Sequence, residues 1–201
     1  MLGRKLFSVV LSALSLYSSN SYAATNPEKL EKFNHQRNDK NKIGMITLGT
    51  WGLGNIATGL ALYGNSKEDN KYFHEMNMAW GLINLGIAGF GFYGSIDQDN
   101  KLNLADTVDE QKKMENILLL NTGLDVAYSS IGLYLREMSN NSSDNKDRLK
   151  GYGNSLIMQG AFLFAFDLTL FLLHNNHNKE LKEILNNTEV KSGSISYNLN
   201  F

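Results

Sequence analysis

Cysteine is absent from this chain of 201 residues, and proline occurs once. The absence of cysteine excludes disulfide bonds, thiolate catalysis, cysteine-ligated metals and a lipid-modified N-terminal cysteine. An excess of either charge is also missing, because 19 basic residues stand against 20 acidic ones. Such a balance provides no basic surface for a nucleic acid, so we expect no nucleic-acid partner.

The N-terminus has the three parts of a secretory signal peptide. Arg4 and Lys5 precede an apolar run over residues 6–16, and small residues ending at Ala23 supply a cleavage site. The apolar run is short for the ~20 residues that a membrane span needs, which disfavours the alternative of an uncleaved anchor helix. We therefore predict a signal peptide over residues 1–23 and an exported protein in a membrane of the cell envelope, inner or outer.

Four apolar segments follow, separated by connections rich in Asn, Lys and Asp. Their midpoints fall near Leu53, Gly86, Val126 and Phe164. Each segment is long enough for a membrane-spanning helix, and the short connections make neighbouring helices antiparallel. Repeated glycines favour close contacts between such helices. We predict an all-α protein with an antiparallel four-helix transmembrane bundle over residues 43–177. A water-soluble helical bundle is the alternative, because the segments are only moderately hydrophobic.

Smaller elements are predicted on both sides of the bundle. Residues 24–42 form a polar arm with a short amphipathic helix that places Leu30 and Phe33 at the membrane interface. Residues 178–201 form a polar and then strand-like tail, in which apolar residues alternate with polar ones toward Phe201. A single strand pairs with a protein partner, rests on a membrane or stays disordered.

A polar side chain lies near the middle of each apolar segment. These residues are Asn55, Asn84, Asp125 and Asp167. At a rise of about 1.5 Å per residue they fall in one layer roughly 5 Å thick, so we predict a polar midplane cluster. The cluster is either a hydrogen-bonded core that fixes helix register, or a cation or proton site built on the two aspartates.

Two further groups are candidate sites near the ends of the helices. An interface cluster of His74, Asn77 and Trp80 marks where a ligand from outside would arrive. His174, His177 and Glu180 follow at intervals of three, and with His74 they offer a weak metal-site pattern. The competing interpretation is histidine near a helix C-terminus, where partial charge is favourable. We expect no bound metal and no other cofactor.

Four stretches of the chain resemble a known family. They are GMITLGTWGLGNIATG, KYFHEMNMAWGLINLGIAG, LNTGLDVAYSSIGLYL and LIMQGAFLFAFDLTLFLLH. The chain resembles an uncharacterised family of small four-helix membrane proteins, a domain of unknown function seen mainly in Bacteroidota. FHEMNMAW is the most distinctive piece of the likeness. The resemblance implies the fold and an envelope membrane location, and it implies no activity.

The sequence therefore predicts an integral envelope membrane protein with a structural or interaction role. Its expected partners are the lipid bilayer and a protein that binds the C-terminal tail. The alternative is a small cation- or proton-handling membrane protein that uses Asp125 and Asp167. An enzyme is not supported, because no serine has a nucleophile context and no glycine-rich phosphate loop follows a strand.

Overall fold

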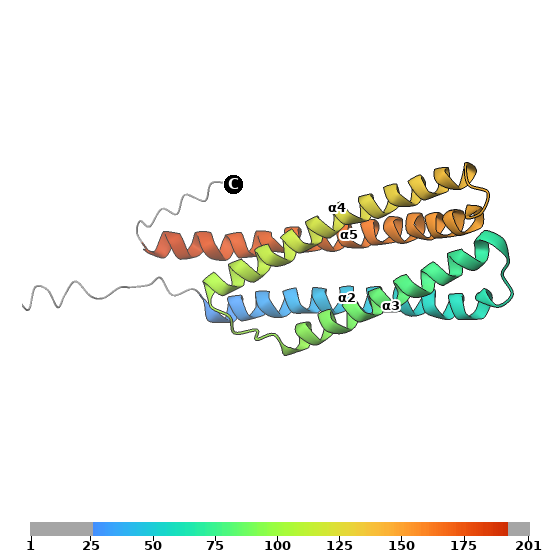
Figure 1. Ribbon diagram of the computed structural model, residues 1–201. Coiled ribbons are helices and arrows are strands. Elements are labelled where there is room, and N and C mark those ends of the chain that lie inside the picture. The colour runs from blue at the N-terminus through green and yellow to red at the C-terminus, as the bar shows by residue number, and fades with distance from the viewer. Residues whose placement is uncertain (1–25, 193–201) are drawn as a thin grey trace, which may run out of the picture.

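The computed structural model describes residues 26–192 of the chain, and for residues 187–192 it describes only the helical backbone. Over this range the chain forms four long helices (Figure 1). They are α2 (Pro27–Tyr63), α3 (Glu68–Asp97), α4 (Leu104–Asn140) and α5 (Lys146–Ser192). The prediction of an all-α chain with four antiparallel helices is confirmed. The predicted signal peptide and the strand-like end of the tail lie outside the described residues.

The polar arm is not a separate short helix, which corrects one prediction. Residues 27–42 continue without a break into the first apolar segment as α2, which starts where the Asn26 side chain accepts the backbone N–H of Glu28 at 3.1 Å. Leu30 and Phe33 do not face a membrane interface. They are buried against Leu181 of α5, because α5 also continues far beyond its apolar segment.

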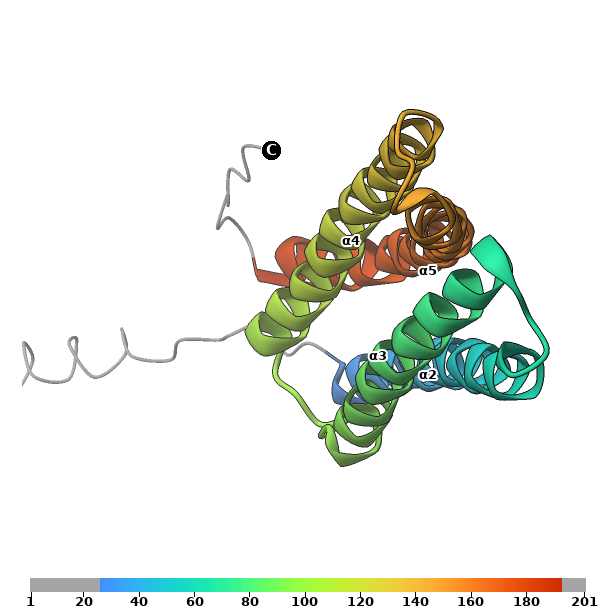
Figure 2. The same cartoon turned by 45° about the vertical axis from the view of Figure 1, so that its right-hand side comes forward.

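The four helices are arranged as two hairpins, α2 with α3 and α4 with α5 (Figure 2). Each hairpin crosses at a pair of glycines. A Cβ atom added to Gly81 would lie 2.7 Å from the carbonyl oxygen of Gly52, and one added to Gly132 would lie 2.7 Å from the carbonyl oxygen of Gly153. Only glycine permits such close backbone contact. The two hairpins then meet chiefly through α3 and α5.

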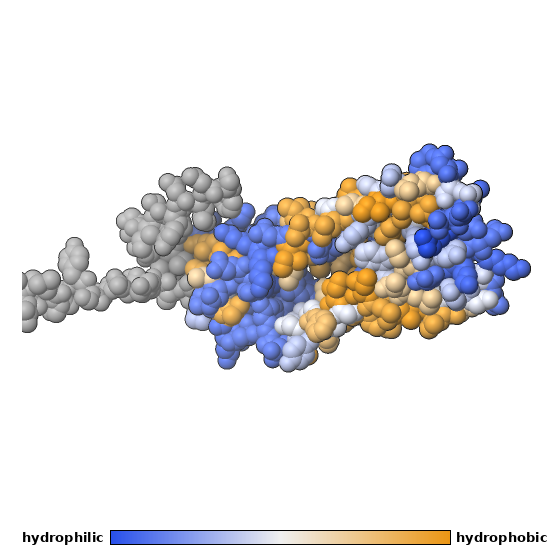
Figure 3. Space-filling model, viewed as in Figure 1, coloured by the Kyte–Doolittle hydropathy of each residue, from blue (hydrophilic) through white to orange (hydrophobic). Residues whose placement is uncertain are grey.

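The face of the molecule in Figure 3 carries a broad apolar band between two hydrophilic ends, and large apolar side chains are exposed on all four helices. The larger hydrophilic end is built by the start of α2, the start of α4 and the C-terminal part of α5. Three helices, α2, α3 and α5, are long and apolar enough to cross a membrane. The fourth predicted span, in α4, is not among them, because Asn121, Asp125 and neighbouring serines interrupt its apolar run.

The interior of the apolar band is polar, which reverses the distribution of a water-soluble bundle. Phe90 is 84% exposed and Leu60 is 70% exposed, whereas Asn84 is 1% exposed and Gln159 is fully buried. Buried polar side chains line the contacts between helices along most of their length. The functional chemistry of this chain must therefore be sought along the axis of the bundle.

Candidate functional site in the polar interior

Gln159 of α5 is the centre of a hydrogen-bond network that joins three helices. Its side-chain oxygen accepts the indole N–H of Trp51 at 2.8 Å and the amide of Asn84 at 3.5 Å. Its amide nitrogen donates to the side-chain oxygens of Asn55 at 2.8 Å and Asn77 at 3.1 Å. One side chain thus connects α5 to α2 through Trp51 and Asn55 and to α3 through Asn77 and Asn84.

Two further bonds complete this group, which we call the amide network. The hydroxyl of Ser155 donates to the side-chain oxygen of Asn77, and the amide of Asn55 donates to the backbone carbonyl of Trp51 at 2.8 Å. The amide network consists of Trp51, Asn55, Asn77, Asn84, Ser155 and Gln159. Because the amide side chains of this network are buried, each of these bonds satisfies a group that would otherwise be costly to bury.

The two aspartates form a second group, the carboxyl pair. Asp125 of α4 and Asp167 of α5 are buried and within hydrogen-bonding reach of each other, and Asn121 is a further partner of Asp167. The Oδ2 atom of Asp125 is buried without a hydrogen-bond partner. The carboxyl pair is thus a contact between α4 and α5 in which one acceptor atom of Asp125 has no partner.

The predicted midplane cluster is divided into these two groups. Asn55 and Asn84 meet through Gln159, whereas Asp125 and Asp167 meet each other. No hydrogen bond found among residues 26–192 joins the two groups. Their separation has a physical reason, because Leu163 lies one helical turn from both Gln159 and Asp167. It packs with Leu48 and Ala88 into an apolar layer.

The predicted interface cluster is divided as well. His74 and Asn77 both line a groove of 640 Å³ between α2, α3 and α5. Trp80 instead packs edge-to-face on Tyr128 of α4, with ring centroids 5.0 Å apart. His74 and Asn77 thus form one site with the groove, and Trp80 belongs to the contact between the hairpins.

The hydrophilic end of the bundle holds a polar core that the sequence analysis did not anticipate. Arg37 is 1% exposed, donates to the backbone carbonyl of Thr107 at 3.4 Å and has one Nη atom without a partner. Asn34 donates to the hydroxyl of Thr107 at 2.9 Å, and Gln111 donates to the carbonyl of His174 at 2.9 Å. These bonds fasten α2 and α5 to the start of α4.

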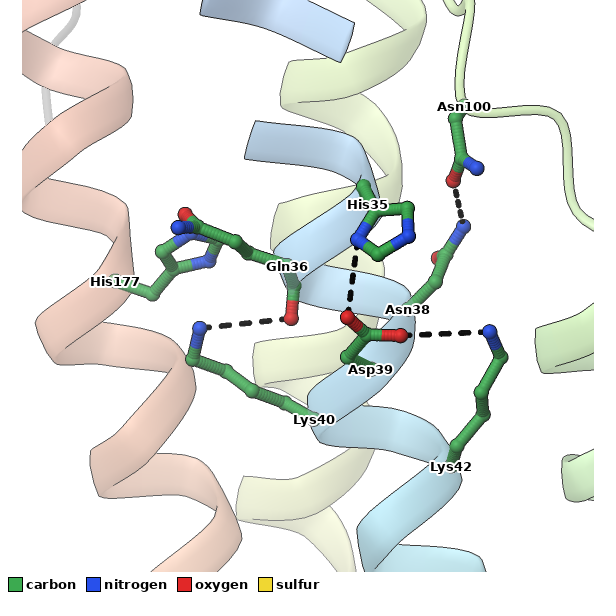
Figure 4. Close-up of polar contacts among 8 residues, drawn as sticks. All are labelled: His35, Gln36, Asn38, Asp39, Lys40, Lys42, Asn100 and His177. Atoms are coloured by element: carbon green, nitrogen blue, oxygen red, sulfur yellow. Dashed lines mark hydrogen bonds and ion pairs between the residues drawn. The ribbon is translucent and has the colours of Figure 1, made fainter. Parts of the chain in front are cut away.

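Polar contacts continue along α2 at this end (Figure 4). Asn38 donates to the side-chain oxygen of Asn100 at 2.7 Å, which holds the α3–α4 connection against α2. Gln36 lies 3.1 Å from a ring nitrogen of His177. The N-terminal part of α2 is therefore part of the bundle core, and the connection is fixed by side chains rather than by regular structure.

The weak metal-site pattern is not assembled. His177 lies 3.8 Å from Glu180, but no group of three potential ligands is found within the described part of the chain. His74 is far from this end. It lies one turn before Asn77, which contacts Ser155. Ser155 and His174 are nineteen positions apart on α5, which corresponds to about 28 Å. The inclusion of His74 was wrong because α3 and α5 run in the same direction, so the start of α3 and the C-terminal part of α5 lie at opposite ends of the bundle (Figure 1).

His177 is held neutral rather than charged, which corrects the helix-terminus interpretation. Its ring stacks on Phe33 with centroids 4.1 Å apart, in the extension of α5 beyond the apolar segment. Burial, together with the nearby charges of Lys40, His174 and Arg37, lowers the pKa of His177 to about 4. Because α5 continues to Ser192, no helix C-terminus lies near enough to favour a charged ring.

Acidification is expected to loosen this end of the bundle. His177 takes up a proton below its ordinary pKa of 6.5 in the unfolded chain, but only near pH 4 in the folded one. The unfolded chain therefore binds more protons between these values, and stability falls as the pH falls through this window. Circular dichroism melting in detergent at pH 7.5, 6, 5 and 4.5 measures it. His177→Gln should reduce the slope without abolishing it, because burial lowers the pKa of His174 to about 4 as well. An unchanged slope would contradict the assignment.

The fold and the interior together define a four-helix bundle with an apolar surface band and a hydrogen-bonded polar axis. A family model described as "Family of unknown function (DUF6992)" matches residues 47–168, more than half of the chain. The chain belongs to this family, and the predicted membership of an uncharacterised family is confirmed. No curated protein and no solved structure matches the chain. The matched region contains the amide network and the carboxyl pair, and it leaves out Arg37 and His177.

Proposed function

We propose that this protein is an integral membrane protein of the cell envelope with a structural or interaction role. In this proposal the amide network sets the register of the helices within the bilayer. The observation that carries it is the exposed apolar band around a buried polar axis, with Phe90 and Leu60 outside and Asn84 and Gln159 inside. In water this band would be a large unprotected apolar surface, whereas in lipid it matches the surroundings.

Membrane fractionation with an alkaline carbonate wash tests this location. The full-length chain is expected to remain in the pellet after the wash and to be released only by detergent. A peripheral protein held by surface charge would be extracted by carbonate. Recovery in the soluble fraction would exclude the integral membrane assignment.

A second function, handling of a cation or proton, is favoured by one observation. The Oδ2 atom of Asp125 is buried without a partner, and Asp167 lies within reach. Intramembrane carboxyl groups commonly mark ion or proton pathways. The structural role is better supported, because the amide network is bonded on three helices.

Replacing Asp125 with Asn separates the two functions. An amide keeps the size of the side chain and can donate to Asp167, so the unfolding midpoint in detergent should be unchanged or raised. Vesicles containing the wild-type protein and a pH-sensitive dye should show no proton flux at any external pH. Flux through the wild-type protein that Asp125→Asn or Asp167→Asn abolishes would establish the second function instead.

A further inference from the structure

The groove next to His74 differs from the rest of the apolar band. It is bounded by α2 from Ile46 to Gly59 on one side and by Met158 and Phe162 of α5 on the other, and its volume is 640 Å³. α2 and α5 make few direct contacts, so the groove separates two helices that are joined through α3. It lies among exposed apolar residues such as Leu53 and Leu60, and therefore opens within the apolar band.

The dimensions of the groove suit an extended hydrocarbon chain. Ile46 and Gly59 are thirteen residues apart on α2, which corresponds to about 20 Å along the helix axis. One leaflet of the hydrocarbon core is about 15 Å thick, half of the usual ~30 Å. The side walls are mainly apolar and aromatic, with Trp51 stacked on Phe162 at a centroid distance of 3.8 Å. Threonines also line the groove, and the hydroxyls of Thr47 and Thr50 donate to backbone carbonyls of α2.

One end of the groove carries an unused polar group. His74 is 9% exposed, and its Nδ1 atom is buried without a hydrogen-bond partner. The two amide side chains that line the groove, Asn55 and Asn77, already form hydrogen bonds in the amide network. His74 follows the first residue of α3, Glu68, by six residues, about 9 Å, which places it near the end of the apolar band.

We propose that this groove binds one acyl chain of a membrane phospholipid, with the ester carbonyl of that chain accepting a hydrogen bond from the ring of His74. The proposal rests on the membrane location proposed above. The acyl chain fills the apolar length beside Trp51 and Phe162, and the ester lies at the polar end. A lipid with this arrangement covers the gap between α2 and α5, and its ester lies against the ring of His74, which lines the groove.

Two glycines allow the groove to be blocked without disturbing the fold. A Cβ atom added to Gly54 meets nothing within 4 Å, and Gly54 lines the groove. Gly86 of α3 is equally open, but it does not line the groove. Gly54→Leu therefore fills the site from its wall, and Gly86→Leu is a matched control that adds the same side chain elsewhere on the apolar band.

Fluorescence of Trp51 measures occupancy of the groove. The chain has two tryptophans, so a Trp80→Phe background leaves Trp51 as the reporter. The protein is reconstituted in phosphatidylcholine bilayers with increasing fractions of a phospholipid brominated at mid-chain. In the parent with Trp80→Phe, Trp51 should be quenched at lower fractions of brominated lipid than random contact with lipid would give. The control variant Gly86→Leu should show the same quenching.

The variants give outcomes that decide the proposal. Gly54→Leu should lose most of this quenching, and His74→Phe should shift it to higher fractions of brominated lipid. Equal quenching in Gly54→Leu and in the control would overturn the proposal. Absence of quenching in the parent, together with a dimer by light scattering, would assign the groove to a second copy of the chain. Retention in the carbonate pellet shows separately whether the membrane location holds.

Discussion

Replacing Gln159 with leucine is expected to lower the free energy of unfolding by at least about 2 kcal/mol, because four interhelical bonds are lost and such bonds average about 0.6 kcal/mol each. Leucine has nearly the volume of glutamine, so the change removes hydrogen bonds and creates little space. Trp51 loses its acceptor, Asn55 loses its donor, and Asn77 loses one of its two donors and keeps Ser155. Titration of the purified protein from mild detergent into sodium dodecyl sulfate, followed by circular dichroism, measures the loss.

The matched control for this variant is Gln98→Leu. Gln98 makes a single bond to Glu110 at 3.3 Å at the margin of the bundle, so its loss should stay within about 0.5 kcal/mol. Equal effects of the two substitutions would show that the amide network contributes no special stability. In that case the buried amides would be satisfied by water, and the proposed role in helix register would be withdrawn.

The second large effect is expected at the glycine crossings. A Cβ atom in Gly81→Ala would lie 2.7 Å from the carbonyl oxygen of Gly52 and 2.8 Å from a side-chain carbon of Ile56. The backbone cannot yield as a flexible side chain does, so α2 and α3 must separate. We expect a loss of about 1–3 kcal/mol, as for other overpacked interiors.

Gly86→Ala, on the same helix, is expected to raise the stability rather than lower it. Its Cβ atom meets nothing within 4 Å, and alanine favours a helix over glycine by up to about 1 kcal/mol. The unfolding midpoint should therefore rise for Gly86→Ala and fall for Gly81→Ala in the same detergent titration. A fall of similar size for both would mean that glycine is needed in α3 for its flexibility and not for close packing.

The helical class and the approximate positions of the four helices could be predicted from the sequence, because long apolar runs and helical spacing are local properties. The lengths of α2 and α5 could not be predicted from hydropathy alone. Their polar ends continue the helices, and the buried positions Leu30, Arg37 and Gly59 lie on the same face of α2. The spacing of three and four residues from Leu30 onward was the signal that the arm belongs to the core.

The sequence allowed most residues of the candidate site to be predicted, but not which of them bond to one another. Depth estimated from the sequence places Asn55, Asn84, Asp125 and Asp167 in one layer. In the structure Gln159, which binds Asn55 and Asn84, and Asp167 lie eight residues apart on α5, about 12 Å along the axis. Depth also does not say which faces meet. That depends on the rotation of each helix, which the glycine crossings and the hairpin pairing set. Gln159 became the centre of the network because it lies on the buried face of α5, four residues before Leu163.

Labelling of single cysteines with a water-soluble maleimide shows whether the exposed apolar band lies in lipid. The natural chain has no cysteine, so each introduced thiol reports without background. Phe90 is 84% exposed within the apolar band, and Lys113 is exposed on the charged start of α4. The membranes are permeabilised so that the reagent reaches both faces of the bilayer. Lys113→Cys should then be labelled, and Phe90→Cys should resist labelling until the protein is denatured. Rapid labelling of Phe90→Cys before denaturation would show that the apolar band faces water and not lipid.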